Sequence, residues 1–392
     1  MLHISDEQRS PARNGHRPFG LRPKSRQPAL LAPHLEPPNF VARALAGGIL
    51  AGNAATECMS TDPSGLRDWL HAVWYGRRPE RWLLWPAAQL WRLVAAVRRF
   101  AYVSGIARVR GVCRPVVVVG NITAGGTGKT PLVIWLAGQL RDAGFEPGIV
   151  SRGYGGRRHR AQRVRADSDP RETGDESVLL ARRCACPVAV GADRVAAARL
   201  LEADADVIIS DDGLQHLALA RSLEIAVIDG ARGLGNGLCL PAGPLREPAS
   251  RLRTVDVVVE NVTAGGVVRH GGLAMTLVAS DAVGVATGER RPLEAFRGQG
   301  VHALAAIGNP DRFFRQLEGF GLRLIAHPLA DHKRLAPRDI EFPDGLPVLM
   351  TEKDAVKCLG FASARHWFVP VDAGFAAADA AALRRAVLGV VP

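Results

Sequence analysis

The stretch VVVVGNITAGGTGKTP, residues 116–131, decides the fold of this chain. Its four consecutive valines, residues 116–119, predict a fully buried strand. A glycine-rich turn leads to Lys129 and Thr130, and residues 132–140 then predict an apolar helix. This order is typical of a phosphate-binding loop (P-loop), because backbone N–H groups and the positive end of the helix dipole converge there on an anion.

The loop residues expected to contact a nucleoside triphosphate are Thr123, Ala124, Gly125, Gly126, Thr127, Gly128, Lys129 and Thr130. Lys129 can reach the β- and γ-phosphates, and the Thr130 hydroxyl can ligate Mg²⁺. The usual P-loop pattern has a glycine at the position of Thr123, so the match is incomplete. A structural turn between a strand and a helix is the alternative interpretation.

The whole chain is long and strongly basic. Its 392 residues can form two domains, and its formal net charge is +12 with a pI of about 10.2. Such a charge favours an anionic partner: nucleic acid, an acidic membrane surface or a phosphorylated substrate. The six cysteines lack the spacing of a metal site. Because no signal peptide and no apolar stretch long enough to span a bilayer is visible, we expect a cytoplasmic protein.

Alternating strand and helix patterns after residue 115 predict an α/β fold: a P-loop, doubly wound, mainly parallel sheet with a second, smaller α/β domain. We expect five segments. Residues 1–58 form an extension without fixed structure, so Met59 is the expected natural start. The others are amphipathic helices (59–112), the P-loop domain (113–264), a β-hairpin, two-stranded linker (265–295) and the smaller domain (296–392) with an alanine-rich last helix.

Residues 66–110 carry five of the seven tryptophans, interleaved with arginines. Helices with aromatic bulk and a basic flank lie in the headgroup layer of a membrane, with tryptophan at the interface and arginine on anionic lipid. We therefore expect this segment to bind a membrane surface. A helical hairpin packed on the domain, with tryptophan in the core, is the alternative.

Further polar residues follow predicted strands. Asp211 and Asp212 end one strand, where a carboxylate can hold Mg²⁺ beside phosphates, although such residues also cap helices. Asp175 and Glu176 precede a helix and could simply cap it. Two glycine-rich loops are candidate functional loops. One, at 151–156, contains Arg152, which can meet an anion; the other, at 233–248, contains Asn236, Arg246 and Glu247.

Together these segments resemble the tetraacyldisaccharide 4'-kinases of Gram-negative bacteria. The resemblance covers about residues 65–375 and rests on NITAGGTGKTP, SRGYGG, GDE, SDDGLQH, LPAGPLREP, IGNP, the Asp-His pair at 331–332 and MTEKDAVK. It implies transfer of the ATP γ-phosphate to the 4'-hydroxyl of a tetraacyl disaccharide 1-phosphate in lipid A biosynthesis. It also implies Mg²⁺, two α/β/α domains with the active site between them, and peripheral attachment to the cytoplasmic face of the inner membrane.

The resemblance also implies residue roles. Asp175 would accept the proton of the sugar hydroxyl, assisted by His332, which Asp331 steadies. Thr130, Asp211, Asp212 and Glu247 would lie around the metal, and Arg152, Asn236, Arg246 and His216 around the substrate. Family members often have a second histidine where this chain has Lys333, and the N-terminal extension has no family counterpart.

Two other classes of protein remain open from the residues. A P-loop ATPase or GTPase that acts as a nucleotide switch would show a similar loop and paired aspartates. A nucleic-acid binder would explain the positive charge, but no binding module supports it, so we expect no nucleic-acid partner. No obligate protein partner is inferred.

Overall fold

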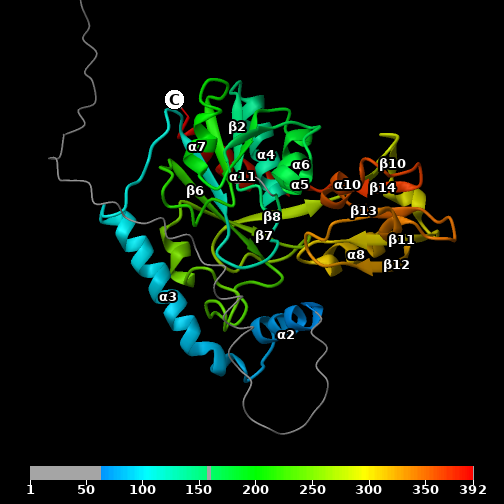
Figure 1. Ribbon diagram of the computed structural model, residues 1–392, viewed down its shortest axis with the longest axis horizontal. Coiled ribbons are helices and arrows are strands. Elements are labelled where there is room, and N and C mark those ends of the chain that lie inside the picture. Colours follow the sequence, from blue (N-terminus) through cyan, green and yellow to red (C-terminus); the bar gives the residue numbers. More distant parts are fainter. Residues whose placement is uncertain (1–62, 157–159, 392) are drawn as a thin grey trace, which may run out of the picture. The chain divides into compact units, whose positions relative to one another are not determined.

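The structure is a computed structural model that describes residues 63–156 and 160–391. The expected extension at 1–58 and the suggested start at Met59 lie outside the described residues. The strands form two sheets (Figure 1). The larger has nine strands in the order β15-β8-β7-β6-β1-β5-β2-β4-β3, and the smaller has six in the order β10-β9-β14-β13-β11-β12.

The larger sheet is parallel from β8 to β4, and its two edge strands, β15 and β3, are antiparallel to their neighbours. Its strands are β1 (Val116–Gly120), β2 (Pro147–Ser151), β3 (Gln162–Val164), β4 (Val188–Val190), β5 (Val207–Asp211), β6 (Leu223–Asp229), β7 (Val257–Asn261), β8 (Leu273–Val278) and β15 (Asp372–Phe375). The mainly parallel sheet predicted from the sequence is confirmed.

Strand β1 lies at the centre of this sheet, between β5 and β6. Its side chains alternate between two cores: Val117 and Val119 belong to one, Val116 and Val118 to the other. Burial on both faces explains the unbroken run of valines. Because the chain continues to one side of β1 through β2 and to the other through β6, the P-loop lies at the switch point where parallel sheets bind ligands.

Helices cover both faces of the larger sheet. The first core takes in residues of α4 (Lys129–Asp142), α6 (Asp175–Arg183) and α11 (Ala377–Leu388). The second takes in residues of α7 (Arg194–Arg199) and is joined by Trp91 of α3. The remaining short helices near this sheet are α5 (Pro170–Thr173) and the 3-10 helix η1 (Ala249–Thr254). Two helices precede the sheet in the chain: α2 (Pro63–Tyr75) and α3 (Arg81–Val103).

The smaller sheet contains four mutually parallel strands, β12, β11, β13 and β14, and the antiparallel strands β9 and β10. Their bounds are β9 (Asp281–Gly284), β10 (Arg290–Pro292), β11 (Gly300–Ala305), β12 (Arg323–Pro328), β13 (Val348–Thr351) and β14 (His366–Val369). The associated helices are η2 (Leu293–Phe296), α8 (Pro310–Gly319), α9 (Pro337–Ile340) and α10 (Glu352–Cys358).

Two expectations about segment boundaries are wrong. Residues 265–295 do not form a separate two-stranded linker: β8 belongs to the larger sheet and β9 to the smaller, so the chain crosses between the sheets at Ala279 and Ser280. The chain also returns after β14, because β15 pairs with β8 and α11 packs on the larger sheet through Leu383 and Val387. The last helix therefore does not belong to the smaller unit, which consists of the smaller sheet and its associated helices.

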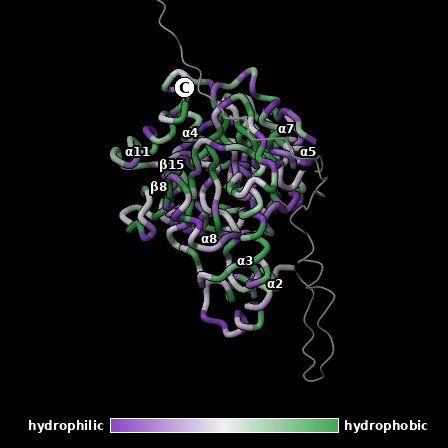
Figure 2. The backbone as a smooth tube through the Cα atoms, turned by 90° about the vertical axis from the view of Figure 1, so that its left-hand side faces the viewer, coloured by the Kyte–Doolittle hydropathy of each residue, from purple (hydrophilic) through white to green (hydrophobic). Residues whose placement is uncertain are grey.

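Helix α3 packs along one side only. Ala88 is buried and Trp91 packs against the core of the larger sheet, whereas Leu83, Leu90 and Val94 are 82%, 63% and 55% exposed. Hydrophobic and hydrophilic residues alternate along the helix (Figure 2). Within the described residues no helix is both long and apolar enough to cross a bilayer.

Candidate active site

The P-loop has the backbone that its glycines allow. Gly128 precedes α4 with φ +93°, and Gly125 has φ +105°. Both values lie in the left-handed region that favours glycine. A Cβ at Gly128 would also stand 2.7 Å from Nδ2 of Asn261, the last residue of β7, whose amide donates a 3.0 Å hydrogen bond to the Thr127 carbonyl. The turn is therefore fixed from the neighbouring strand.

Lys129 lies where the β1–α4 turn opens. Its Nζ donates to Asn121 Oδ1 at 3.1 Å and forms an ion pair with Asp212 Oδ1 at 3.4 Å. The Asn121 amide donates in turn to the Thr123 carbonyl at 2.8 Å, so one side chain orders the loop and holds the lysine. Nothing in the sequence around Asn121 indicates this role.

Thr123 occupies the position where a P-loop usually has a glycine. This part of the loop is paired with the segment around Leu245, which explains why a glycine is not needed there. It forms an antiparallel bridge with Leu245, and the Ala124 N–H donates to the Pro244 carbonyl at 2.7 Å. The Arg246 N–H closes the pairing on the Ile122 carbonyl, also at 2.7 Å. The proline- and glycine-rich loop at 233–248 thus braces the P-loop.

Asp212 is held by two cations. Arg246 contacts its Oδ2 at 3.1 Å, and Lys129 lies on its other oxygen. Burial opposes ionisation, but the charges of Lys129 and Arg246 prevail and lower the pKa of Asp212. Its φ of +49° turns the chain directly after β5. Arg194, buried below this turn, donates to the carbonyls of both aspartates.

Asp211 has the environment of a metal ligand. It pairs in register with Val119, next to the P-loop, and its side chain is buried with Oδ1 lacking a hydrogen-bond partner. Burial, aided by the negative charge of Glu176, raises the pKa of the Asp211 carboxyl. A divalent cation would satisfy that oxygen. No cluster of three or more His, Cys, Asp or Glu in the described ranges forms a metal cage, but Mg²⁺ needs only one or two carboxylates when phosphates complete its shell.

Glu247 and His216 are engaged differently from what was expected. Glu247 Oε1 accepts from Gln215 at 2.8 Å, and Oε2 lies 3.4 Å from Arg251, so both oxygens of this expected metal ligand have protein partners. The pKa of His216 is lowered to about 3 by burial and by nearby arginine charge, so its ring is neutral near neutral pH. His216 lines neither pocket described below.

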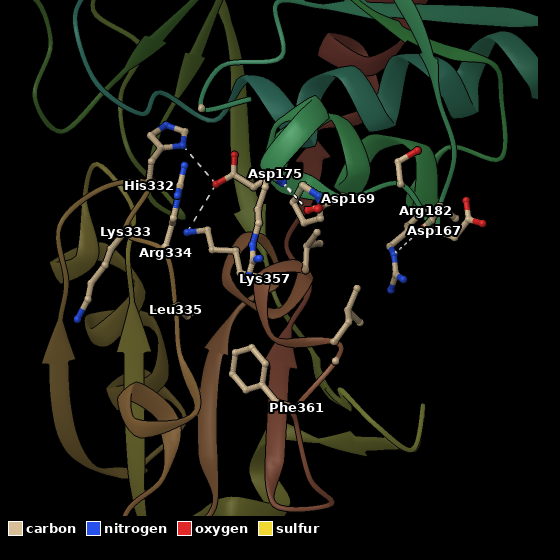
Figure 3. A pocket seen from close by; sticks show the side chains of 18 residues that line it. Asp167, Asp169, Asp175, Arg182, His332, Lys333, Arg334, Leu335, Lys357 and Phe361 are labelled. Carbon is tan, nitrogen blue, oxygen red and sulfur yellow. Dashed lines mark hydrogen bonds and ion pairs between the residues drawn. The ribbon is translucent and has the colours of Figure 1, made fainter. Parts of the chain in front are cut away.

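Asp175 and His332 come together from the two sheets. Asp175 begins α6 beside the larger sheet, and His332 follows β12 of the smaller sheet with φ +59°. Asp175 Oδ2 lies 3.2 Å from His332 Nδ1 (Figure 3). The other ring nitrogen, Nε2, lies 3.2 Å from Lys353 Nζ. Because an ammonium group only donates, Nε2 accepts and Nδ1 carries the proton toward Asp175.

The expected role of Asp331 in steadying His332 stays a prediction, because the two side chains form only a long ion pair. Asp331 Oδ1 is 3.8 Å from His332 Nε2, beyond hydrogen-bond distance, and 3.6 Å from Lys353. Lys353 therefore holds the histidine, and Glu176 holds Lys353 at 3.0 Å. Burial would lower the pKa of Lys353, but Glu176, Asp175 and Asp331 together raise it, so the ammonium stays charged.

A second lysine secures Asp175 itself. Lys357 Nζ lies 3.5 Å from Asp175 Oδ2 and 2.8 Å from Asp354. Burial would raise the pKa of Asp175, but the hydrogen bond from His332 and the lysine charges lower it to about 2. Both lysines come from α10, which begins within the MTEKDAVK motif, and Thr351 caps this helix by accepting from the Asp354 N–H.

Asn236 and Arg152 lie apart from this pair. The Asn236 amide donates to the carbonyls of Val73 and Ala242, so it attaches helix α2 to the loop at 233–248. The Trp74 indole makes a further 2.8 Å hydrogen bond to Pro241. Asn236 is thus occupied within the protein. Arg152 is exposed after β2 and lines neither pocket.

Two pockets adjoin the consecutive residues Asp331 and His332. One, of about 390 Å³, contains Ala124, Gly125, Gly308 and Asp331 and is bordered by His71, Trp74 and Tyr75 of α2. The other, of about 490 Å³, contains Asp175 and His332 together with Arg171 and Arg334. The site therefore joins an anion-binding loop to a carboxylate–imidazole pair, an arrangement suited to phosphoryl transfer onto a hydroxyl.

Comparison with known proteins gives a consistent result. The family described as tetraacyldisaccharide-1-P 4'-kinase matches residues 80–391. A tetraacyldisaccharide 4'-kinase of Nitrosococcus oceani is 53% identical over 302 residues, which are 76% of this chain and 88% of the relative. One of Alkalilimnicola ehrlichii is 54% identical over 317 residues, 78% and 92% of the two chains. The crystal structure of LpxK from Aquifex aeolicus in complex with ATP has a TM-score of 0.67 at 25% identity, covering 80% of this chain and 99% of that one.

Proposed function

The chain belongs to the tetraacyldisaccharide-1-P 4'-kinase family, and from this membership we propose that it transfers the γ-phosphate of ATP to the 4'-hydroxyl of a tetraacyl disaccharide 1-phosphate. The observation that carries the proposal is the 3.2 Å contact between Asp175 and His332, next to a P-loop. The relatives' names supply the acceptor, and the Aquifex structure supplies ATP.

In the proposed reaction the P-loop amides and Lys129 bind the triphosphate, in place of the present contacts of Lys129 with Asn121 and Asp212. Arg246 keeps Asp212 in place. Thr130 and Asp211 are the residues expected to hold Mg²⁺, which when bound supplies charge neutralisation on the phosphates. Asp211 fits this role because its Oδ1 is buried and unpartnered.

Asp175 acts on the acceptor. Its Oδ2 is held by His332 and Lys357, and its Oδ1 accepts the Glu176 N–H. The 4'-hydroxyl oxygen attacks the γ-phosphorus, the bond from that phosphorus to the β-γ bridging oxygen breaks, ADP leaves, and the hydroxyl proton passes to Asp175. With its pKa near 2 the carboxylate is ionised but weakly basic, so its main contribution is to orient the hydroxyl.

The exposed face of α3 supports attachment to a membrane surface. Leu83, Leu90, Val94 and Phe100 are each more than half exposed, and arginines accompany them. A water-soluble acceptor would not require such a face, whereas a tetraacyl lipid lies in a bilayer. We place the protein at the cytoplasmic face of the inner membrane, bound peripherally.

The test is phosphate transfer from ATP to a detergent-solubilised tetraacyl disaccharide 1-phosphate, with the product's 4'-phosphate identified by mass spectrometry. We expect transfer by the unchanged protein and by the control Asp142→Ala, at the exposed end of α4, and its loss in Lys129→Ala. ATP hydrolysis without a phosphorylated acceptor would favour the nucleotide switch instead.

A further inference from the structure

The 490 Å³ pocket beside Asp175 is built from both sheets. Asp169, Arg171 and Arg182 come from the α5–α6 segment, and Arg334, Leu335 and Phe361 come from the smaller unit. Figure 3 shows Arg182 and Asp169 on one side of it and His332 and Arg334 on the other. Its volume suits part of a ligand, such as one phosphorylated sugar, and not a whole tetraacyl lipid.

The position of this pocket points to the acceptor. Two consecutive residues divide the site: Asp331 lines the pocket that contains the P-loop residues Ala124 and Gly125, whereas His332 and Asp175 line the larger pocket. A triphosphate on the P-loop therefore lies on the Asp331 side. A hydroxyl that reaches Asp175 from the other side brings the rest of its molecule into the larger pocket.

The carboxylates and lysines of this pocket already have protein partners. Asp167 contacts Arg165 at 3.0 Å, and Asp169 caps α5 through the Arg171 N–H at 2.8 Å. Lys333 pairs with Asp339, and Lys357 with Asp354.

Two arginines differ from these groups. The guanidinium groups of Arg171 and Arg334 are exposed at the pocket, and neither has an ion pair or side-chain hydrogen bond among the described residues. Their positive charges are available to a ligand.

We propose that this pocket binds the reducing-end sugar 1-phosphate of the acceptor, with Arg171 and Arg334 as the partners of its phosphate. The inference rests on the proposed function, because it places the far end of the same acceptor. A guanidinium group donates two parallel hydrogen bonds to a phosphate, which suits arginine better than lysine for this task. The pocket also contains Leu335, Val356 and Phe361, which offer an apolar surface to the sugar ring.

The experiment compares two acceptors: the tetraacyl disaccharide 1-phosphate and the same disaccharide without its 1-phosphate. For the first, we expect the Arg171→Ala/Arg334→Ala double variant to raise the acceptor KM about tenfold or more, with kcat and the KM for ATP little changed. For the second, variant and unchanged protein should have the same KM. Arg338→Ala, an exposed arginine of α9 outside the pocket, is the matched control.

Each other outcome has a defined meaning. An equal rise in KM for both acceptors, or a rise in the KM for ATP alone, would overturn the pocket assignment. Compared with Arg334→Ala, the Arg334→Lys variant should recover only part of the affinity for the 1-phosphorylated acceptor, because one ammonium group replaces a guanidinium group that donates two hydrogen bonds. Single variants and melting temperatures separate a loss of binding from a loss of fold. Failure of the unchanged protein to phosphorylate either acceptor would instead defeat the proposed function.

Discussion

Arg312, in α8 of the smaller unit, donates a hydrogen bond of 2.6 Å to Asn261 at the end of β7 in the larger sheet. The amide of Asn261 donates in turn to the Thr127 carbonyl in the P-loop. One arginine of the smaller unit therefore reaches the P-loop through a single intervening side chain. The placement of the smaller unit and the shape of the loop are linked.

Removing that arginine should weaken ATP use. We expect Arg312→Ala to raise the KM for ATP about tenfold, because a hydrogen bond to a charged donor contributes about 1.5–3 kcal/mol. Steady-state kinetics with varied ATP measure the effect. Arg315→Ala, an exposed arginine of the same helix, is the control. Equal KM values for ATP in the two variants would show that Asn261 holds the P-loop without Arg312.

The Asp175–His332 contact should behave as a unit. We expect Asp175→Ala to lower kcat by at least about 10²-fold, because the variant loses both the group that orients the hydroxyl and the acceptor of its proton. His332→Ala should also lower kcat, and the double variant should be little worse than Asp175→Ala, since His332 acts through the carboxylate. Single-turnover phosphate transfer measures all three. If the losses in kcat of the two single variants multiply in the double variant, the two residues act independently.

The lowered pKa of Asp175, about 2 against an ordinary 3.8, also predicts a pH dependence of stability. A carboxyl with a lowered pKa stabilises the fold above its ordinary value, and that contribution is lost as the pH falls through the lowered one. We expect Asp175→Asn to unfold more easily by roughly 2 kcal/mol near neutral pH. The difference should close between pH 3.8 and about 2.

Urea unfolding of both proteins over a pH series tests this. A difference that already disappears between about pH 7 and about pH 5 would assign the effect to another group. Far-UV circular dichroism at each starting pH keeps acid unfolding of the whole chain separate from the local effect.

The outer face of α3 should determine membrane binding. We expect Leu83→Ser/Leu90→Ser/Val94→Ser to bind vesicles containing anionic lipid at least about tenfold more weakly, because apolar area no longer enters the headgroup layer. Ile325→Ser, an exposed apolar residue of β12, is the control. Cosedimentation measures binding. Turnover of a detergent-solubilised acceptor should stay unchanged, since none of these residues lines the two pockets.

Much of the fold could be predicted because its signals are local. The buried valines of β1, the glycines before Lys129 and the aspartates after β5 each follow from the chain nearby, and the structure brings Lys129 and Asp212 together. The proposed catalytic pair is different. Asp175 and His332 are far apart in the sequence, so only the family resemblance put them in one site.

The rest depended on tertiary pairing that a single sequence does not encode locally. An alanine-rich helix shows no preference for either sheet, so the return of α11 to the larger one was missed. Lys353 follows a capping threonine, and nothing in its neighbours indicates contact with His332. Asn236 looked available for substrate, yet its amide binds two carbonyls that lie far apart in the chain.

One tryptophan of α2 and one of α3 are hydrogen-bonded to the loop that braces the P-loop. Trp74 donates to Pro241, and Trp91 donates to Arg246 at 2.9 Å. On a bilayer these two hydrogen bonds would hold the site of phosphate transfer at a fixed distance from the lipid surface. The sugar of the acceptor could then enter while its hydrocarbon tails remain among their neighbours, so each turnover would avoid the cost of lifting the tails into water.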